Sequence, residues 1–151
     1  MSIDIKQIST NDPLYQQERE LRNETLLRPI GIKDFGWEHR DKEAHHIIAY
    51  QKTANNENQV VGCVLLYQLP NTQIGQLMQM AVRSNLQKTG VGKSLTEKLL
   101  ELAAENNLDT VFCHARESVY GFYEKLGFKK EGPEFNEVGV THNKMIIKVV
   151  K

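Results

Sequence analysis

The sequence has little of several features that would each indicate a particular class of protein. It contains 2 cysteines, 4 prolines and 1 tryptophan among 151 residues, and its 19 basic side chains are balanced by 19 acidic ones. A formal charge of zero provides no long-range field, so we expect neither nucleic acid nor an anionic membrane as a partner. The lack of a signal peptide and of a long apolar run favours a cytoplasmic protein.

The cysteines and histidines indicate neither a disulfide nor a metal centre. Cys63 and Cys113 both fall in segments that we expect to be strands, and a reducing compartment favours buried free thiols over a bridge. None of the histidines has metal-ligand spacing to either cysteine, so we expect no metal. A chain of this length is most simply one domain, which we place at 1–151.

Hydrophobic periodicity and turn residues predict a sheet made mostly of hairpins. We expect strands at 3–8, 45–52, 59–69, 76–82, 110–115, from Phe128 onward and at 144–150, and helices at 13–27, 91–106 and 118–126. The strand, helix and strand over 76–115 would form a parallel pair. The predicted fold class is therefore α/β (α+β), a single mixed, mostly antiparallel sheet flanked by helices.

The helix ends carry recognisable signals. Asn11, Asp12 and Pro13 are typical of a helix start. Pro29 should end the first helix, because the residue before a proline is pushed out of the helical region. After it, residues 29–44 lack periodicity, which indicates a loop or a loop with one short helix. Asn106 or the asparagine that follows it can supply the left-handed residue that closes the second helix.

The segment 87–94 follows an apolar strand and opens an amphipathic helix. The first amides of a helix have no intrahelical partner and lie at the positive end of its dipole, so they can bind an anion. Gly90 and Gly92 carry no Cβ atom that would block a ligand, and Lys88 and Lys93 add positive charge. The turn predicts a phosphate or pyrophosphate ligand, although its glycines alone would equally fit a turn without a ligand.

Spacing decides which phosphate-binding motif the turn matches. Gly92, Lys93 and Ser94 fit the end of a nucleotide P-loop, but Gln87 stands where its first glycine belongs. A dinucleotide fingerprint would need a third glycine at Leu95. Both nucleotide interpretations therefore fail.

Two motifs together resemble one known family. Gln87-x-x-Gly90-x-Gly92 after the strand Q-M-A-V resembles the acyl-CoA pyrophosphate loop of the GNAT superfamily of N-acetyltransferases. The segment F-Y-E-K-L-G-F at 122–128 is similar to the end of a later helix in the same superfamily, with the matching order and separation. The resemblance extends more weakly from about Val60 to the C-terminus.

The resemblance implies a fold, an activity and a set of binding residues. The fold would be the GNAT-like acyl-CoA N-acyltransferase fold, and the activity would be transfer of an acetyl group from acetyl-CoA to a primary amine by direct attack. The acetyl-CoA cosubstrate would lie on the pyrophosphate loop and on the exposed backbone of the preceding strand, where relatives carry a bulge that leaves amides unpaired. These residues are Met80, Ala81, Val82, Gln87, Lys88, Thr89, Gly90, Val91, Gly92, Lys93 and Ser94.

Tyr123 is the candidate general acid, because a phenol on the helix facing the donor can give a proton to the departing thiolate. Packing is its alternative role. Tyr120 lies three residues earlier on nearly the same helical face and is the substitute acid. Phe122 and Phe128 are expected in the core.

The chain departs from the family pattern at two places. Arg116 stands where many relatives have an asparagine that contacts the pantetheine arm, so this contact stays open. The strand 76–82 offers no glutamate that could act as a base, which leaves His142, Glu137 and Glu43 as candidates.

The acceptor and the alternative function also stay open. Residues 29–44 match the segment that lines the acceptor side in this superfamily, and their acids and bases nearly balance, so either a small-molecule or a peptide amine would fit. A homodimer is compatible with the resemblance. The alternative function is a non-catalytic acyl-CoA-binding sensor or regulatory module.

Overall fold

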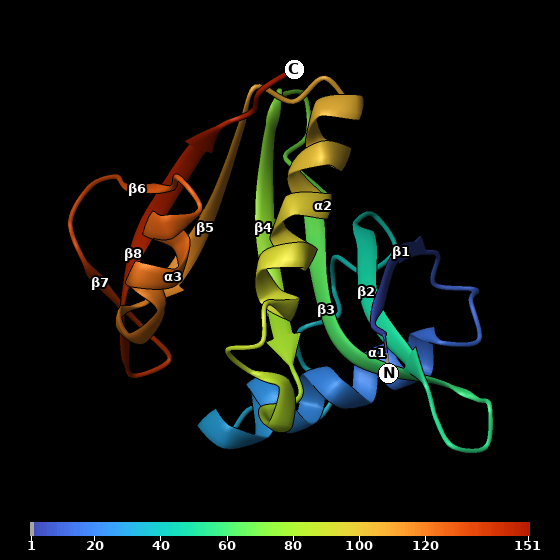
Figure 1. Cartoon of the computed structure of the whole chain (residues 1–151). Coiled ribbons are helices and arrows are strands. Elements are labelled where there is room, and N and C mark those ends of the chain that lie inside the picture. Colours follow the sequence, from blue (N-terminus) through green and yellow to red (C-terminus); the bar gives the residue numbers. More distant parts are fainter. Residues whose placement is uncertain (1) are drawn as a thin grey trace.

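The computed structural model describes residues 2–151, which form a mixed sheet with helices on its faces (Figure 1). The α-helices are α1 (Tyr15–Arg22), α2 (Val91–Glu105) and α3 (Tyr120–Lys125). The strands are β1 (Asp4–Ile8), β2 (His45–Lys52), β3 (Asn58–Gln68), β4 (Ile74–Val82), β5 (Thr110–Arg116), β6 (Lys129–Lys130), β7 (Phe135–Glu137) and β8 (Val140–Lys148). Within these residues, no helix has the length and apolar character needed to cross a membrane.

The strand order confirms the predicted fold class. Over the described residues the order is β1-β2-β3-β4-β5-β8-β6, and β7 pairs with β8. β4 and β5 are parallel, because α2 carries the chain back across the sheet between them. The other pairs are antiparallel.

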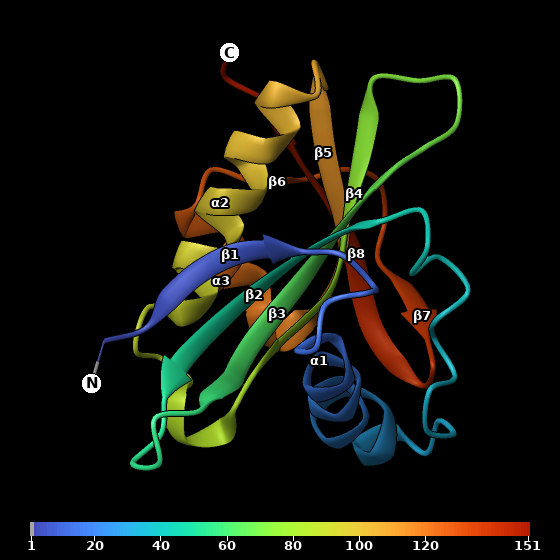
Figure 2. The same cartoon turned by 90° about the vertical axis from the view of Figure 1, so that its right-hand side faces the viewer.

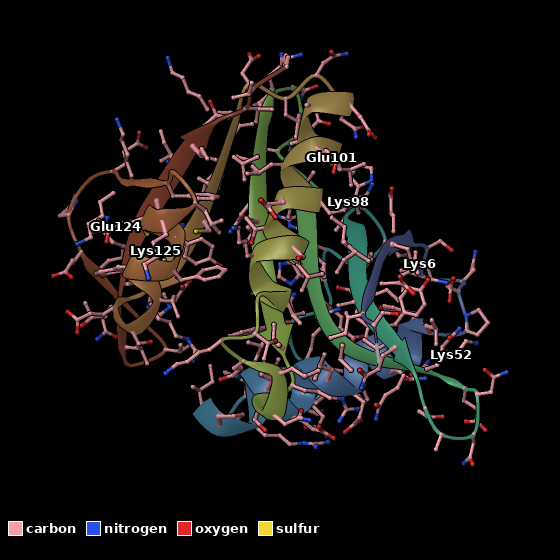
Figure 3. All side chains as sticks on the ribbon, in the orientation of Figure 1. Lys6, Lys52, Lys98, Glu101, Glu124 and Lys125 are labelled. Atoms are coloured by element: carbon pink, nitrogen blue, oxygen red, sulfur yellow. The ribbon has the colours of Figure 1, made fainter. Side chains whose placement is uncertain are left out.

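Different helices cover the two faces of the sheet. α2 buries Leu95 and Leu99 fully against the strands, and α3 closes the same core. α1 packs on the opposite face, where Leu21 joins a smaller cluster (Figure 2). Burial of each such leucine stabilises the fold by roughly 1.5–3 kcal/mol. Charged residues such as Lys98 and Glu101 lie on the side of α2 away from the sheet (Figure 3).

β4 leaves β5 soon after the two strands meet. Their parallel pairing ends at Gln76 and Phe112. Beyond this point β5 pairs with β8 alone and β4 pairs with β3 alone. Figure 1 shows the two strands diverging from there. The edge of β4 that faces β5 therefore has backbone groups without a strand partner from residue 77 to residue 82.

A β-bulge accompanies this divergence. Between Cys63 and Leu65, β3 advances by two residues while its partners on β4 advance by three, from Ala81 to Met78. Within this interval Gln79 has a φ of 53°, in the left-handed region. Such a conformation costs a non-glycine residue about 1–3 kcal/mol, so surrounding contacts must hold it.

The bulge changes which side chains face which helix. Leu77, Met80 and Val82 all pack into the α2 core, whereas Ala81 packs into the α1 cluster. Regular alternation from Leu77 would have placed Met80 and Val82 on the α1 side, because successive side chains of a strand point to opposite faces. The bulge expected from the resemblance is thus present, and it reverses side-chain direction near Gln79.

The start of the first helix differs from the predicted residue 13. α1 begins at Tyr15. Asp12 accepts a hydrogen bond from the Leu14 N–H, 2.8 Å long, in a turn that precedes the helix. The polar residues predicted as a cap therefore shape the turn and do not cap the helix itself.

The first helix ends before Pro29, as predicted, although its regular α-helical part is shorter than expected. After α1 the chain widens into a π turn at Asn23–Leu27 and then tightens into a 3₁₀ turn at Arg28–Ile30. Pro29 lies in the first residues of that turn, where its missing N–H is not needed. Gly31, with a φ of 76°, ends the helical run.

The C-terminal strands also differ from the prediction. The last strand starts at Val140 and not at residue 144, because Val138 and Gly139, both at positive φ, fold β7 back onto it. β7 has too few residues to show an alternating pattern in the sequence. The strand expected from Phe128 is limited to β6, whereas the end of α2 is as predicted, with Asn107 left-handed at a φ of 58°.

Both cysteines are free and buried, as predicted, with Cys63 on β3 and Cys113 on β5. Burial raises the pKa of Cys113 to about 12 and also raises the pKa of Cys63. Since the thiolate is the reactive form, we expect the native protein to react very slowly with an aromatic disulfide reagent at neutral pH. In denaturant both thiols should react at once. Rapid reaction of either cysteine in the folded protein would contradict this.

Candidate functional site

The turn before α2 presents free amides at the end of β4. The first intrahelical bond of α2 runs from the Ser94 N–H to the Gly90 carbonyl, 3.0 Å apart. The helical amides that precede this bond are those of Val91, Gly92 and Lys93. These groups have no partner within the helix and lie at the positive end of its dipole, so they can bind an anion.

Side chains of the turn fold it back onto the sheet. Gln87 Nε2 donates to the Val82 carbonyl over 3.1 Å, which ties the turn to the last residue of β4. The Thr89 hydroxyl donates to the Leu86 carbonyl. Lys88, Lys93 and Ser94 are exposed, so their polar groups face solvent beside the free amides.

The two glycines of the turn meet different requirements. Gly90 has a φ of 96°, and a Cβ atom there would meet nothing within 4 Å. At Gly92 a Cβ atom would lie 3.2 Å from Cζ of Phe122, a half-buried residue of α3. The missing Cβ atom at Gly92 therefore makes room for the Phe122 ring, whereas the space beside Gly90 is open.

Tyr123 is buried, with 6% of its surface exposed. Its ring contacts the ring of Phe122 at a centroid distance of 5.0 Å and that of Phe128 at 5.3 Å, both edge to face. Burial and, to a smaller degree, the neighbouring Cys113 raise the pKa of Tyr123 well above its ordinary value. The phenol is therefore protonated at neutral pH, as a general acid must be, and it also packs in the core.

Tyr120, the substitute acid, already has partners. Its hydroxyl donates to Glu134 over 3.0 Å, and the Lys130 ammonium lies 4.4 Å from the ring centroid. Burial and the Glu134 carboxylate raise the pKa of Tyr120 to about 12. The two tyrosines share α3 but differ in surroundings.

Two of the three base candidates lie next to each other. His142 Nε2 is 3.6 Å from the Glu137 carboxylate. Nδ1 of His142 donates to the Val140 carbonyl over 2.8 Å, which directs Nε2 toward the acid. His114 approaches the same carboxylate at 3.8 Å. Sequence spacing did not indicate His114, because β5 and β8 are neighbours only in the folded sheet.

Arg116 and the third base candidate, Glu43, lie in different parts of the structure. Arg116 ends β5 directly opposite His142 on β8, on the strand that diverges from β4. Glu43 is exposed and pairs with Arg40 at 3.8 Å in the segment before β2. Arg116 thus lies beside the divergence and beside one base candidate, whereas Glu43 belongs to a separate surface pair.

A buried polar cluster was missed by sequence reasoning. The guanidinium of Arg22 uses all its N–H groups: Nε donates to Gln79, Nη1 to Glu18 and Asp41, and Nη2 to Asp41 and the Trp37 carbonyl, at distances of 2.7 to 3.0 Å. Gln79 in turn donates to the Trp37 carbonyl over 2.6 Å. We call this set, with Tyr15 and His46, the Arg22 network. Its signal in the sequence is a charged pair, Glu18 and Arg22, four residues apart on a helix with few apolar residues.

The charges of the network balance. His46 Nδ1 contacts the Glu18 carboxylate at 2.9 Å and Nε2 contacts the Asp41 carbonyl at 2.7 Å. Both partners are acceptors, so both ring nitrogens donate and the ring is an imidazolium. Tyr15 donates its hydroxyl to Asp41 over 2.5 Å. Two cations, Arg22 and His46, therefore face two buried carboxylates.

The same side chains have a spacing that a metal ion could use. Ligand atoms of Glu18, Asp41 and His46 lie within 4.8 Å of one another. The Arg22 guanidinium already contacts both carboxylates, and the His46 ring contacts Glu18. A metal ion would have to displace these cations. The expectation of no metal is not tested by this geometry and remains a prediction.

Comparison with known proteins identifies the family. Residues 23–149 match the model of the acetyltransferase (GNAT) domain. This match covers most of the chain, including the turn before α2 and all of β4, β5 and α3. The chain belongs to the GNAT acetyltransferase family.

The chain is also similar to individual curated proteins. The chain is 30% identical to YyaT, an uncharacterized protein of Bacillus subtilis, over 67% of this chain and 64% of YyaT. It spans 63% and 64% of the length of two curated Bacillus subtilis relatives that it matches.

Solved structures share the fold. Escherichia coli ElaA superposes with a TM-score of 0.82 at 17% identity, covering 96% of this chain and 99% of ElaA. An aminoglycoside 6'-N-acetyltransferase complexed with coenzyme A superposes with a TM-score of 0.77 at 20% identity, covering 98% of each chain. The predicted GNAT-like fold is thereby confirmed.

The network makes stability depend on the charge of His46. Burial alone would lower the pKa of His46, but the hydrogen bond and charge of Glu18 outweigh it and raise the pKa above the ordinary 6.5. The folded state therefore binds this proton more tightly than the unfolded state. The stabilisation is fully present below about pH 6.5 and is lost as pH rises through the folded pKa.

We therefore expect the stability advantage of wild type over His46→Gln to shrink as pH rises above about 6.5. Urea unfolding of both proteins between about pH 6 and 9 measures it. The pKa of His45 is lowered by burial and also by the charge of His46, so the comparison removes only the burial part of the His45 contribution. An advantage that grows with pH would mean that His46 is neutral in the folded protein.

Proposed function

We propose that the protein transfers an acetyl group from acetyl-CoA to a primary amine by direct attack. The observation that carries the proposal is the combination of an unpaired edge on β4 with an anion-binding turn directly after it. One site can thereby hold an extended arm by its backbone and a pyrophosphate at the arm's end. The coenzyme A complex of the aminoglycoside 6'-N-acetyltransferase supports this ligand class.

Acetyl-CoA would supply the acetyl group as a thioester. The free amides of Val91, Gly92 and Lys93 would bind the pyrophosphate, and Lys88 and Ser94 would add contacts from their exposed side chains. The backbone of Met80, Ala81 and Val82 would pair with the pantetheine arm on the edge that faces β5. Gln87 and Thr89 would hold the turn in shape through their bonds to backbone carbonyls.

The chemical step requires one proton donor and one proton acceptor. As the amine nitrogen bonds to the carbonyl carbon and the carbon–sulfur bond breaks, Tyr123 would give its phenolic proton to the sulfur. Its raised pKa keeps that proton in place at neutral pH. The amine would lose a proton to the His142 and Glu137 pair, which we favour over Glu43 because the two groups adjoin each other beside the end of β5.

The proposal for donor binding is tested by a matched pair of glycine variants. Gly90→Ala places a side chain at positive φ and should distort the turn that aims the amides, weakening acetyl-CoA binding on the order of tenfold, about the value of one charge-assisted hydrogen bond. Gly121→Ala in α3 has an ordinary φ and open space, so its affinity should equal that of wild type. Calorimetry with acetyl-CoA and CoA measures both.

Gly90 is a sharper test than Gly92, where a new side chain would press on Phe122 and disturb the packing of α3. Wild-type affinity in both Gly90→Ala and Gly121→Ala would show that the turn does not hold the donor. A wild-type protein that does not bind acetyl-CoA at all would refute the proposed function.

Tyr123→Phe should separate binding from chemistry. The change keeps the ring contacts and removes the proton, so acetyl-CoA affinity should be unchanged while kcat falls roughly a hundredfold. The raised pKa keeps Tyr123 protonated in alkaline solution. The kcat of wild type should therefore not fall through deprotonation of Tyr123 below about pH 10, where a tyrosine ordinarily titrates. The measurement is a pH profile of kcat with the best amine from an acceptor screen.

Tyr120→Phe is the control for this experiment. If Tyr120→Phe loses turnover and Tyr123→Phe does not, the acid is Tyr120. Binding of acetyl-CoA by wild type without turnover of any amine would instead favour the alternative, a non-catalytic acyl-CoA sensor or regulatory module.

A further inference from the structure

We propose that Gln79 is a positioning residue that fixes the β4 bulge and couples it, through Arg22, to residues 37–41. The inference rests on the proposed function, since its value for catalysis lies in placing the thioester carbonyl on β4. The coupling itself is a property of the fold. It can therefore be tested separately.

The backbone of Gln79 needs support from its surroundings. Its left-handed φ of 53° belongs to a residue with a Cβ atom, at the place where β4 carries one residue more than β3. A residue in this region reverts to extended backbone unless its surroundings prevent it. An extended Gln79 would remove the bulge and return Met80 and Val82 to the opposite face of the sheet.

The side-chain amide of Gln79 forms a hydrogen bond through its oxygen and another through its nitrogen. Oε1 accepts from Nε of Arg22 over 2.7 Å, and Nε2 donates to the Trp37 carbonyl over 2.6 Å. These bonds point from the bulge toward α1 and toward the segment before β2. On the backbone side, the Cys63 thiol of β3 lies 3.5 Å from the Gln79 carbonyl.

Arg22 is held in place by its buried contacts. The residue is 2% exposed, and each of its remaining N–H groups has an acceptor in Glu18, Asp41 or the Trp37 carbonyl. His46 holds Glu18 and the Asp41 carbonyl from β2. A shift of the guanidinium would take one cation away from two buried carboxylates, which is strongly unfavourable. Gln79 is therefore anchored to a fixed group.

These contacts make residues 37–41 and the bulge one unit. The Trp37 carbonyl accepts from both Arg22 and Gln79, and both carboxylate oxygens of Asp41 bond to Arg22. Movement of the segment would pull on the amide of Gln79, and loss of the bulge would remove one of the two hydrogen bonds that the Trp37 carbonyl accepts. A ligand that orders one of them should order the other.

The test compares Gln79→Met with Gln76→Met on the same strand. Methionine has a similar length and cannot make either hydrogen bond, while Gln76 lies before the bulge, at the end of the parallel pairing with β5. In Gln79→Met we expect faster amide hydrogen exchange both at residues 77–82 and at residues 37–41, and in Gln76→Met at neither. Exchange at 37–41 that stays at the wild-type rate in Gln79→Met would overturn the coupling.

Kinetics test the positioning role. We expect kcat of Gln79→Met to fall roughly ten- to a hundredfold, the scale for a reacting group misplaced by about 1 Å, with the acetyl-CoA dissociation constant changed much less. A purely structural residue would lower the melting temperature and leave kcat per folded molecule unchanged. Turnover equal to that of Gln76→Met would exclude the positioning role.

A second variant keeps the test valid if Gln79→Met does not fold. Gln79→Glu keeps an acceptor for Arg22 but cannot donate to the Trp37 carbonyl, so exchange should rise at residues 37–41 and stay at the wild-type rate in β4. Amide exchange at the wild-type rate in Gln79→Glu, both at residues 37–41 and in β4, would contradict the coupling. Absence of turnover in wild type would refute the proposed function alone, because hydrogen exchange does not depend on catalysis.

Discussion

The left-handed backbone at Gln79 is the constraint on which the rest of the site depends. It lets β4 carry an extra residue in the part of the strand that follows the last pair with β5, at Gln76, and that pairs with β3 alone. Hydrogen bonds that would otherwise close the sheet are left open on one strand edge. Such an edge is unfavourable unless something pairs with it, so an extended ligand is its natural partner.

The two faces of the sheet serve this edge in different ways. On one face α2 supplies apolar packing and free amides at its N-terminus, and α3 places Phe122 against Gly92. On the other face α1 supplies buried charges that hold the bulge. Replacing both partners of such a buried pair by apolar residues can be neutral, whereas removing one costs about 3–5 kcal/mol. We therefore infer that the Arg22 network serves mainly to fix the geometry of the bulge.

Features carried by local residue order could be predicted. Helix α2, the turn with Gly90 and Gly92, and the antiparallel strands before it follow from periodicity and from glycine's conformational freedom. The GNAT family assignment followed from two short motifs and is shown by the match over residues 23–149. The position of Pro29 inside a 3₁₀ turn was not predicted, because a π turn followed by a 3₁₀ turn admits a proline that an α-helix would exclude.

The amino-acid sequence by itself determined the order of the main elements, the glycine-containing turn before α2 and the candidate acid Tyr123, since each depends on residues close together in the chain. Tertiary structure decided the rest. The bulge at Gln79, the closure of Arg22 onto residues 37–41 and the meeting of His142 with Glu137 and His114 all join distant segments. Their residue types are ordinary for exposed positions, and burial among specific partners, which no local pattern encodes, gives them their roles.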